Sequence, residues 1–377
     1  MKLLAVTRKP MAMAAEDVGR MDEHRVAGLL NVVVVAAVAA VGYTDWAITA
    51  NVSLGYLYVL PVSLCALVNP PPFTIALAVL CTVLSDIFGP PPGTLFWRVA
   101  HNVVYLASFL VVGFFVTAIA RQRDRMAEKI RQQRDAFERD LALAAQAQRR
   151  VLPKPLVLPG IDIAAEMKTA RLLGGDYYDF FQLSDDVIDV VIADVSGKGA
   201  AAALLMPSLA VALRLRAREL QGPAEVIKDL DNVLKQITNS ATFVTMFYAR
   251  LNRASRVLQY ANAGHNPPLL LRAGSCEPLM LDEAGGPILG ILPDARFSDA
   301  SLTLAPGDIL TLFTDGVTEQ ENEQGEEFAV DRLKDVICRE GTESAAEVVA
   351  HVSEAVAAFA GETEQADDLT VVVLKVL

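Results

Sequence analysis

Residues 172–206 read LLGGDYYDFFQLSDDVIDVVIADVSGKGAAAALLM, and this stretch decides the fold of the C-terminal part of the chain. Val187–Ala193 is aliphatic, rich in β-branched residues and of strand length, so we expect a buried strand there. One acid, Asp176, follows a Gly-Gly pair, and another, Asp194, stands where that strand gives way to a glycine-rich turn and an alanine-rich helix. A buried carboxylate is costly unless its charge is compensated. Several carboxylates in such positions favour a divalent cation.

The charge of the chain is divided unevenly. Residues 1–150 hold 15 of the 33 Lys and Arg and 11 of the 45 Asp and Glu, whereas residues 151–377 hold 18 and 34. The acidic C-terminal half argues against nucleic-acid binding, which depends on neutralising phosphates. A hydrophobic share of 53% indicates that part of the chain lies in lipid. The four cysteines show neither a CxxC pair nor zinc spacing, so we interpret them as small buried hydrophobes.

Four apolar stretches in residues 26–120 predict an N-terminal all-α transmembrane bundle of four helices. They are Val26–Tyr43, Leu54–Val68, Phe73–Phe88 and Val99–Ala120. A spanning helix needs about 20 apolar residues. The first and fourth stretches meet this length, whereas the second and third are short. The alternative is two spanning helices, with the middle pair forming a re-entrant hairpin.

Positive residues flank this region at both ends. Five cations precede the first stretch and three arginines follow the fourth, whereas the loops between the stretches are almost free of Lys and Arg. By the positive-inside rule, both ends lie in the cytoplasm. We therefore expect residues 1–25 to form a cytoplasmic tail of a multi-pass protein of the inner membrane, embedded in membrane lipid, with its C-terminal domain in the cytoplasm. Asp86 and His101 lie near helix ends, so we interpret both as interfacial.

Residues 121–152 predict a helical linker. The segment up to Arg150 contains neither Gly nor Pro. A stripe of mostly apolar residues recurs in it at steps of three and four: Met126, Ile130, Gln133, Phe137, Leu141, Ala144 and Gln148. Such a stripe lies on one face of a helix. It is typical of a parallel two-stranded coiled coil, which would make the protein a homodimer. The alternative is a single solvated helix packed on the C-terminal domain.

Residues 153–377 predict a mixture of strands and helices. The expected strands are 161–167, 187–193, 242–251, 257–263, 269–272, 309–314 and 369–377, and the expected helices are 199–218, 223–239, 328–340 and 345–358. Acids stand at the edges of apolar strands four times, at Asp176, Asp194, Asp315 and the pair Asp367 and Asp368.

Carboxylates gathered in one place repel one another unless a cation binds. Ligands that are all oxygen favour Mg²⁺ or Mn²⁺ over zinc. Two such ions about 3.5–4 Å apart form an arrangement that hydrolyses phosphate esters. Residue type therefore points to metal-assisted phosphoryl hydrolysis, provided that folding brings the acids together. Taken singly, Asp176 is equally well read as a turn residue and Asp194 as a helix cap.

Five segments carry a resemblance to a known family: GGDYYDF, ADVSGKGAAAALLM, NAGHNPPLLL, LFTDGVTEQENEQGEEF and DDLTVVVLKV. In order and spacing they resemble the bacterial PPM-type, metal-dependent serine/threonine phosphatases, in the branch that contains RsbU and the stage II sporulation phosphatase. The resemblance covers about residues 146–377. It implies an α+β fold of two packed antiparallel sheets flanked by helices, a four-layer α/β/β/α sandwich with the metals at one end.

The resemblance also implies roles for individual residues. Asp194 would bridge two Mn²⁺ or Mg²⁺ ions, and the Val195 carbonyl would contact one of them. Asp315 and Asp367 would hold the other ion, and Asp176 would bind a metal or its water. A water between the ions, with its pKa lowered by their charge, would attack phosphorus.

Other residues have lesser expected roles. Asp368 ranks second as a metal ligand, because relatives often carry a polar residue there. We interpret His265 as bracing a turn rather than as a general acid, and Lys198 as solvated rather than bound to phosphate. The surroundings of Cys276 and Cys338 lack a phosphate-loop signature, which argues against a cysteine phosphatase. The proton donor to the leaving serine stays unassigned.

These expectations combine into a membrane-anchored, metal-dependent protein serine/threonine phosphatase. By resemblance, its substrate would be a small phosphorylated anti-sigma-factor antagonist. The alternative is a non-catalytic membrane receptor whose phosphatase-like domain only binds a partner. That alternative predicts a missing metal aspartate, and all of them are present in the sequence. A third class, a small transporter with a regulatory tail, lacks any substrate-path signature.

Overall fold

The computed structural model describes residues 4–47, 54–88, 94–197, 200–238 and 242–377. The chain divides into two compact units, Met1–Asp135 and Ala136–Leu377. Each unit has its own apolar core, and each is described by itself.

The N-terminal unit is helical. Its elements are α1 (Leu4–Ala47), η1 (Gly55–Tyr58), α2 (Val59–Val68), α3 (Pro71–Phe88) and the first part of α4 (Leu95–Arg149). A small core at their centre includes Tyr58, Val62 and Phe109. The amide of Asn69 donates to Asn31 Oδ1 over 2.7 Å and joins the end of α2 to α1.

Among the described residues of this unit, three helices are long and apolar enough to cross a membrane: α1 from Arg25 onward, α3 and α4. The prediction of four spanning helices is therefore wrong for the second stretch. There the 4-residue 3₁₀ helix η1 runs into the 10-residue α2. Together they rise about 23 Å, less than the roughly 30 Å of a hydrocarbon core. Pro61, in the first turn of α2, suits the start of a new helix because it lacks an N–H donor.

The structure adds detail to the expectations for the N-terminal tail, for Asp86 and for His101. Helix α1 begins at Leu4, so most of residues 1–25 is helical. Asp86, expected at an interface, forms a bidentate ion pair with Arg98, with 2.6 Å between Arg98 Nη2 and Asp86 Oδ2. The ring of His101 packs edge-on against Tyr105.

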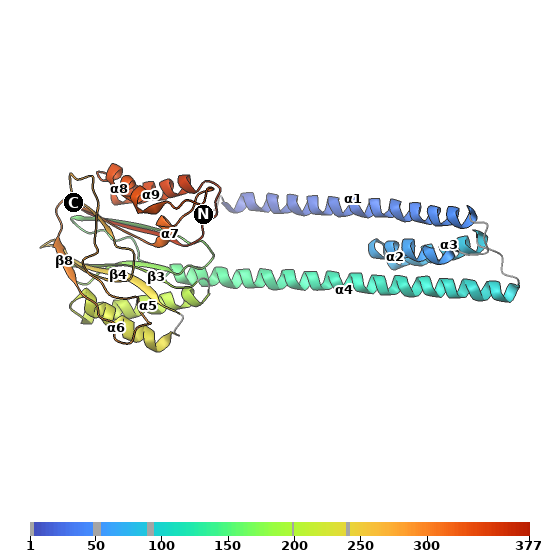
Figure 1. Cartoon of the computed structure of the whole chain (residues 1–377), viewed down its shortest axis with the longest axis horizontal. Helices are drawn as coiled ribbons and strands as arrows, with labels where there is room; N and C mark the ends of the chain where they lie inside the picture. Colours follow the sequence, from blue (N-terminus) through green and yellow to red (C-terminus); the bar gives the residue numbers. More distant parts are fainter. Residues whose placement is uncertain (1–3, 48–53, 89–93, 198–199, 239–241) are drawn as a thin grey trace. The chain divides into compact units, whose positions relative to one another are not determined.

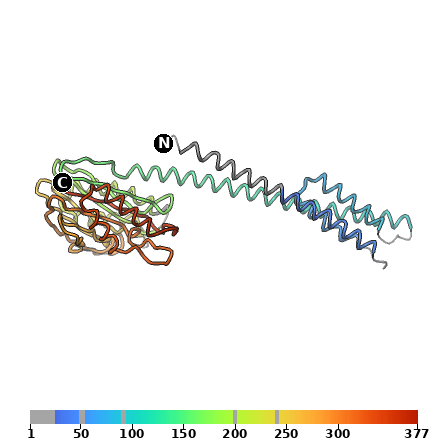
Figure 2. The backbone as a smooth tube through the Cα atoms, turned by 90° about the horizontal axis from the view of Figure 1, so that it is seen from above, coloured from blue at the N-terminus to red at the C-terminus, as the bar shows by residue number. Residues whose placement is uncertain are grey.

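The fourth stretch and the expected helical linker form one continuous helix, α4. It runs unbroken from Leu95 to Arg149 and ends just before Leu152-Pro153 (Figure 2). Proline cannot continue a helix, and the residue before it is pushed towards an extended conformation.

The C-terminal unit contains two sheets of five strands, in which all the described pairs are antiparallel. The first sheet has the order β1 (Ile161–Lys168), β10 (Leu369–Val376), β9 (Ile309–Phe313), β6 (Leu269–Leu271) and β7 (Leu279–Met280). The second has the order β2 (Asp176–Gln182), β3 (Val187–Val195), β4 (Val244–Asn252), β5 (Val257–Ala263) and β8 (Ala300–Thr303).

The strands at the centre of each sheet are buried on both faces, which explains their continuous apolar sequences. In β3, Ile188, Val190 and Ile192 join a cluster that also contains Val372 and Leu374 of β10. Alternate residues of a strand point to opposite faces. Thus the other residues of β3 and β10 pack against helices.

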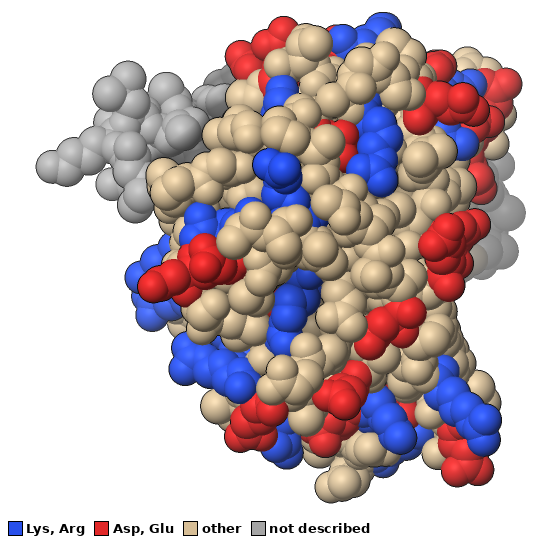
Figure 3. All heavy atoms as spheres, turned by 90° about the vertical axis from the view of Figure 1, so that its left-hand side faces the viewer, with Lys and Arg blue, Asp and Glu red and all other residues tan. Residues whose placement is uncertain are grey.

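Two pairs of helices cover the outer faces of the sheets. Helices α5 (Ala200–Glu219) and α6 (Pro223–Ile237) pack on the second sheet. Helices α8 (Ala329–Glu340) and α9 (Ala345–Ala360) pack on the first sheet, beside the one-turn helix α7 (Asp315–Thr318). Figure 1 shows the two helix pairs on opposite sides of the strands. Positive and negative side chains are interspersed over the face of the molecule drawn in Figure 3.

Candidate metal centre

Asp176 and Asp194 lie opposite each other in the second sheet. Asp176 opens β2, Asp194 is the last residue but one of β3, and the two are direct partners in the antiparallel ladder. A Cβ atom placed on Gly175 would lie 2.9 Å from the Val195 carbonyl oxygen and 3.3 Å from Asp194 Oδ1. Only glycine permits this close approach. The Gly-Gly pair thus places Asp176 beside both Asp194 and the Val195 carbonyl.

Two threonines connect Asp176 to the first sheet. Thr314 and Thr370 donate hydroxyl hydrogen bonds to Asp176 Oδ2, over 2.8 and 2.5 Å. Thr314 directly precedes Asp315, and Thr370 follows Asp368 by two residues. The start of β2, the end of β9 and the start of β10 therefore meet at one edge of the unit.

Gly316 brings the segments of Asp315 and Asp367 into contact. A Cβ atom on Gly316 would lie 2.0 Å from the backbone oxygen of Asp368 and 3.4 Å from the backbone carbon of Asp367. No larger residue fits there without moving the backbone. Asp315, at the start of α7, is thereby held next to the Asp367–Asp368 pair.

Asp368 uses both carboxylate oxygens to hold the glycine loop. Its Oδ1 accepts from the Ala170 amide over 2.9 Å, and its Oδ2 accepts from the Gly175 amide over 2.6 Å. These bonds tie the start of β10 to the loop before β2. The geometry favours Asp368 as an anchor of this loop, and its role as a metal ligand stays a prediction.

The electrostatics of this edge favour a cation. Burial raises the pKa of Asp176 well above its usual range. The charges of Asp194 and Asp368 raise it further, while the hydrogen bonds from Thr370 and Thr314 oppose the shift. By contrast, the side chains at positions 194, 315 and 367 are only half-buried, so an ion can reach them from solvent.

The donor set of this edge is entirely oxygen, from carboxylates and one backbone carbonyl. Such a set fits a hard divalent cation such as Mg²⁺ or Mn²⁺. Within the described residues, no three carboxylate, imidazole or thiol groups are close enough together to form a complete ligand set. The fold thus gathers the backbone segments that carry the acids, and the side-chain ligand geometry remains a prediction.

Gln148 is a buried polar residue that the sequence analysis counted only as part of the helical stripe. It lies in the last turn of α4 and is 5% exposed. Its side-chain amide donates to the Gly174 carbonyl over 2.7 Å, and its Oε1 accepts from the Gly174 amide over 3.4 Å. The end of the linker helix thus holds the same glycine loop as Asp368.

His265 braces a turn, as its sequence context indicated. Its backbone amide donates to Asn262 Oδ1, the Asn262 side chain donates to the His265 carbonyl, and Thr245 Oγ1 lies 2.8 Å from Nδ1. Burial lowers the pKa of His265 to about 4, against a backbone hydrogen bond at Phe313 that favours protonation. A neutral, buried imidazole is poorly suited to donate a proton to a leaving group at neutral pH. Lys198 lies outside the described residues.

Two other buried aspartates of the second sheet have structural partners. Arg214 forms a bidentate pair with Asp179. Arg250 forms one with Asp189 and also donates to backbone carbonyls at the end of α5. Buried charges are normally compensated in this way. These two acids therefore pin α5 to the sheet and are not candidate metal ligands.

A cavity of about 250 Å³ opens beside Asp367. Its lining is rich in acids from the segment after α7 and from the turn before β10, including Glu319, Glu321, Glu327 and Glu364. Such a lining repels a phosphate group unless cations are bound nearby.

Comparisons with known proteins find related sequences and similar structures. Residues 184–377 match the family described as stage II sporulation protein E (SpoIIE). The phosphoserine phosphatase RsbU of Bacillus subtilis (strain 168) is 30% identical over 294 residues, which cover 78% of this chain and 83% of that protein.

Two solved structures are also similar. The RsbU and RsbW domains of Rv1364c from Mycobacterium tuberculosis align with a TM-score of 0.51 and 28% identity, over 60% of this chain and 61% of that one. The SiaA PP2C domain of Pseudomonas aeruginosa aligns with a TM-score of 0.54 and 21% identity, over 64% of this chain and 98% of that one. The second likeness is one of fold alone.

Proposed function

The chain belongs to the stage II sporulation protein E (SpoIIE) family, and from this premise we propose that it is a membrane-anchored, divalent-cation-dependent phosphatase of phosphoserine and phosphothreonine in proteins. Its C-terminal unit has a PP2C-like α/β fold with two antiparallel sheets. Similarity to a phosphoserine phosphatase over 83% of that protein's length supports the reaction class.

One observation carries the proposal: the segments of four strand-edge acids meet at one edge of the unit. Asp194 faces Asp176 in register, and the threonines next to Asp315 and Asp368 bond to Asp176. We propose that Asp176, Asp194, Asp315, Asp367 and the Val195 carbonyl hold two Mn²⁺ or Mg²⁺ ions, with Asp368 as a further ligand or anchor. Bound there, the ions would lower the pKa of a water and offset the charge of the phosphate.

Residues of the chain itself would set the geometry of this reaction. Thr314 and Thr370 fix one oxygen of Asp176, so that its other oxygen keeps a defined direction. Gly175 brings Asp194 and the Val195 carbonyl to the same spot, and Asp368 immobilises the loop before β2. A preformed arrangement needs little reorganisation when charge develops on the phosphate.

The domain organisation is part of the proposal. Residues 1–25 would be a cytoplasmic tail, residues 26–120 a membrane module, residues 121–152 the linker and residues 153–377 the phosphatase. Three long apolar helices support the membrane anchor. The unbroken α4 and its apolar stripe support a coiled-coil homodimer. Apolar clusters between the sheets and beneath each helix pair support the four-layer α/β/β/α arrangement.

We propose a small phosphorylated anti-sigma-factor antagonist as the substrate. Two similarities support it: to the phosphoserine phosphatase RsbU, and to a protein that joins an RsbU domain to an RsbW domain. The rival function, a receptor that binds such a partner without hydrolysing it, is opposed by the presence of every strand-edge acid.

Release of phosphate from a phosphoserine protein substrate by the full chain in detergent tests the proposal. Mn²⁺ should support hydrolysis, and a chelator should abolish it. Asp194→Asn should lower the rate by more than the roughly 10–100-fold that is typical of changes outside the ligand shell. Asp185→Asn, an exposed acid in the β2–β3 turn, is the matched control and should keep the wild-type rate. Equal rates for Asp194→Asn and wild type would remove the proposed metal site, whereas no Mn²⁺-dependent hydrolysis by the wild-type chain would favour the receptor.

A further inference from the structure

Two polar side chains are buried at one end of the N-terminal unit, where the chain passes from α1 through η1 into α2. Asp45, near the end of α1, is 4% exposed, and Tyr58, the last residue of η1, is fully buried. Asp45 Oδ1 accepts from the Leu54 amide over 2.8 Å. Asp45 Oδ2 and the Tyr58 hydroxyl have no hydrogen-bond partner among the residues that the structure describes.

The hydrogen bond from the Leu54 amide satisfies only one of the two carboxylate oxygens of Asp45. A buried polar group without a partner is costly, and a buried charge more so. Asp86 shows the usual solution in the same unit, because Arg98 pairs with it. Ionisable residues within membrane segments are rare, and they commonly mark a functional site. Asp45 lies within the spanning part of α1.

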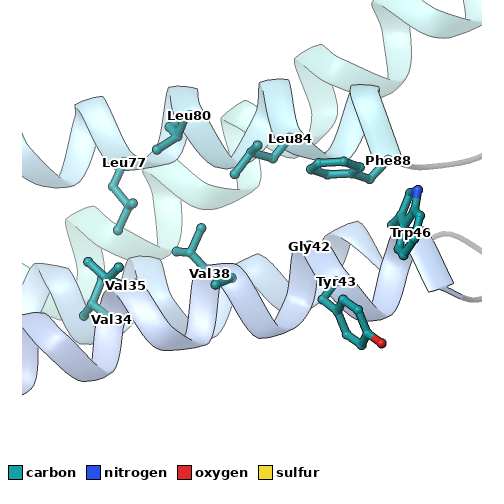
Figure 4. A pocket seen from close by; sticks show the side chains of 11 residues that line it. Val34, Val35, Val38, Gly42, Tyr43, Trp46, Leu77, Leu80, Leu84 and Phe88 are labelled. Atoms are coloured by element: carbon teal, nitrogen blue, oxygen red, sulfur yellow. The ribbon is translucent and has the colours of Figure 1, made fainter.

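A cavity of about 470 Å³ lies between α1 and α3, and its lining includes Trp46, the residue that follows Asp45 in α1. Its walls are almost entirely apolar, with Val34 and Val38 on α1 facing Leu77, Leu80 and Leu84 on α3 (Figure 4). Trp46 and Phe88 stand at the same end of the cavity in Figure 4. The volume lies within the roughly 300–1,000 Å³ of typical small-molecule sites.

Gly42 connects the cavity to the buried polar groups. It lines the cavity, and a Cβ atom at this position would lie 3.1 Å from the Tyr58 hydroxyl and 3.8 Å from the ring of Phe88. The absence of a side chain leaves the hydroxyl next to the cavity wall. Asp45 is three residues further along α1 and so lies on the same face of the helix as Gly42.

We propose that this cavity binds a small lipophilic amine. An ionised carboxylate only accepts hydrogen bonds, so Asp45 Oδ2 suits a cationic donor. The Tyr58 hydroxyl can accept a second hydrogen from the same ammonium group. The apolar walls suit an aliphatic chain or ring. This ligand site is separate from the proposed phosphatase site, and its test does not depend on hydrolysis.

Fluorescence of Trp46 can report binding directly. The chain has two tryptophans, so Trp97→Phe leaves Trp46 as the only one. This variant of the full chain, in phosphatidylcholine nanodiscs, is titrated with a bromine-labelled dodecylamine, and with the alcohol and the carboxylate that carry the same labelled chain. The amine should quench Trp46 saturably and bind at least about tenfold more tightly than the alcohol, because a hydrogen bond to a charged group is worth more than a neutral one.

Three substitutions in the Trp97→Phe background identify the groups involved. Asp45→Asn should abolish the preference for the amine, and Tyr58→Phe should weaken amine binding several-fold. Asp86→Asn removes a charge that is already paired with Arg98, so it is the control and should keep the preference. Equal quenching by all three labelled chains in the Asp45-containing protein would mean partition into lipid and would overturn the proposal. That comparison needs no substitution at the site, so it remains decisive even if a variant fails to fold.

Discussion

Asp176 and Asp194 are direct partners in the β2–β3 ladder, so their side chains leave the same face of the second sheet. Two carboxylates in this relation repel each other, and the charge of Asp194 is one reason why the pKa of Asp176 is raised, after burial. The two hydroxyl bonds to Asp176 Oδ2 partly offset this repulsion. A divalent cation bound between the two carboxylates would attract both and so replace their mutual repulsion with a net attraction. For this reason the pair lies at the centre of the proposed site.

Replacing Thr370 with valine should weaken binding of the metal. The substitution keeps the shape of the side chain but removes the 2.5 Å bond to Asp176 Oδ2. Loss of a group that orients a metal ligand typically costs about 10–100-fold in affinity or activity. We expect the Mn²⁺ concentration for half-maximal phosphate release to rise within this range, and Thr314→Val to act in the same direction.

Thr311 is the matched control, because it lies in β9, the strand that Thr314 directly follows. It is fully buried, and its hydroxyl has no hydrogen-bond partner among the described residues. Thr311→Val should leave the Mn²⁺ requirement unchanged and the domain equally or slightly more stable. If Thr370→Val and Thr311→Val behave alike, Asp176 does not depend on its hydroxyl partners.

Local pattern was enough to predict most strands and helices of the C-terminal unit. Val187–Ala193 is a continuous β-branched run, and it forms the centre of β3. By contrast, β2 was not among the expected strands, because Asp176 after the Gly-Gly pair was equally well interpreted as a turn residue. The two-residue β7, the four-residue β8 and the one-turn α7 were also missed. Such short segments bury few residues and carry no periodicity. In the N-terminal unit, hydropathy located the second stretch, Leu54–Val68, almost to the residue, but its interpretation as a spanning helix was wrong because the stretch is too short.

The candidate site was only partly predictable. Each acid was found because it stands at the edge of an apolar segment, but which strands are neighbours depends on pairing between distant segments, such as β1 with β10. The supporting residues were missed for the same reason. Thr314 and Thr370 look like ordinary strand residues, and Gln148 looks like part of a helical stripe. Their roles appear only when strands and helix ends distant in sequence meet at Asp176 and Gly174.

Gln148→Ala should destabilise the loop before β2. The substitution leaves the buried Gly174 carbonyl without its donor, a loss of about 1–3 kcal/mol. Because the same loop is held by Asp368, we also expect a higher Mn²⁺ requirement for activity. Urea unfolding of residues 136–377 and Mn²⁺ titration of the full chain measure the two effects. Gln146→Ala, an exposed glutamine on the same helix, should change neither. An unchanged unfolding midpoint in Gln148→Ala would mean that the contact adds nothing to the folded state.

His265 should make the C-terminal unit less stable in mild acid. Burial lowers its pKa from the ordinary 6.5 to about 4 in the folded protein. Between these values the unfolded chain binds a proton that the folded chain does not, so the free energy of unfolding falls as the pH drops from about 6.5 towards 4. A shift of this size corresponds to a loss on the order of 3 kcal/mol. Urea unfolding of residues 136–377 at several pH values measures it.

Comparison of two histidine variants separates this effect from the protonation of carboxylates in the same pH range. His265→Asn removes the titrating group, while the backbone bond that His265 donates to Asn262 does not involve the replaced ring. It should therefore lose less stability than the wild type on going from pH 7 to pH 4, even if it is less stable at pH 7. His351→Gln, at a half-exposed position beside Glu340, should retain the wild-type loss. If the acid-induced loss is the same in His265→Asn and wild type, the buried imidazole is not its source, and the carboxylates alone account for it.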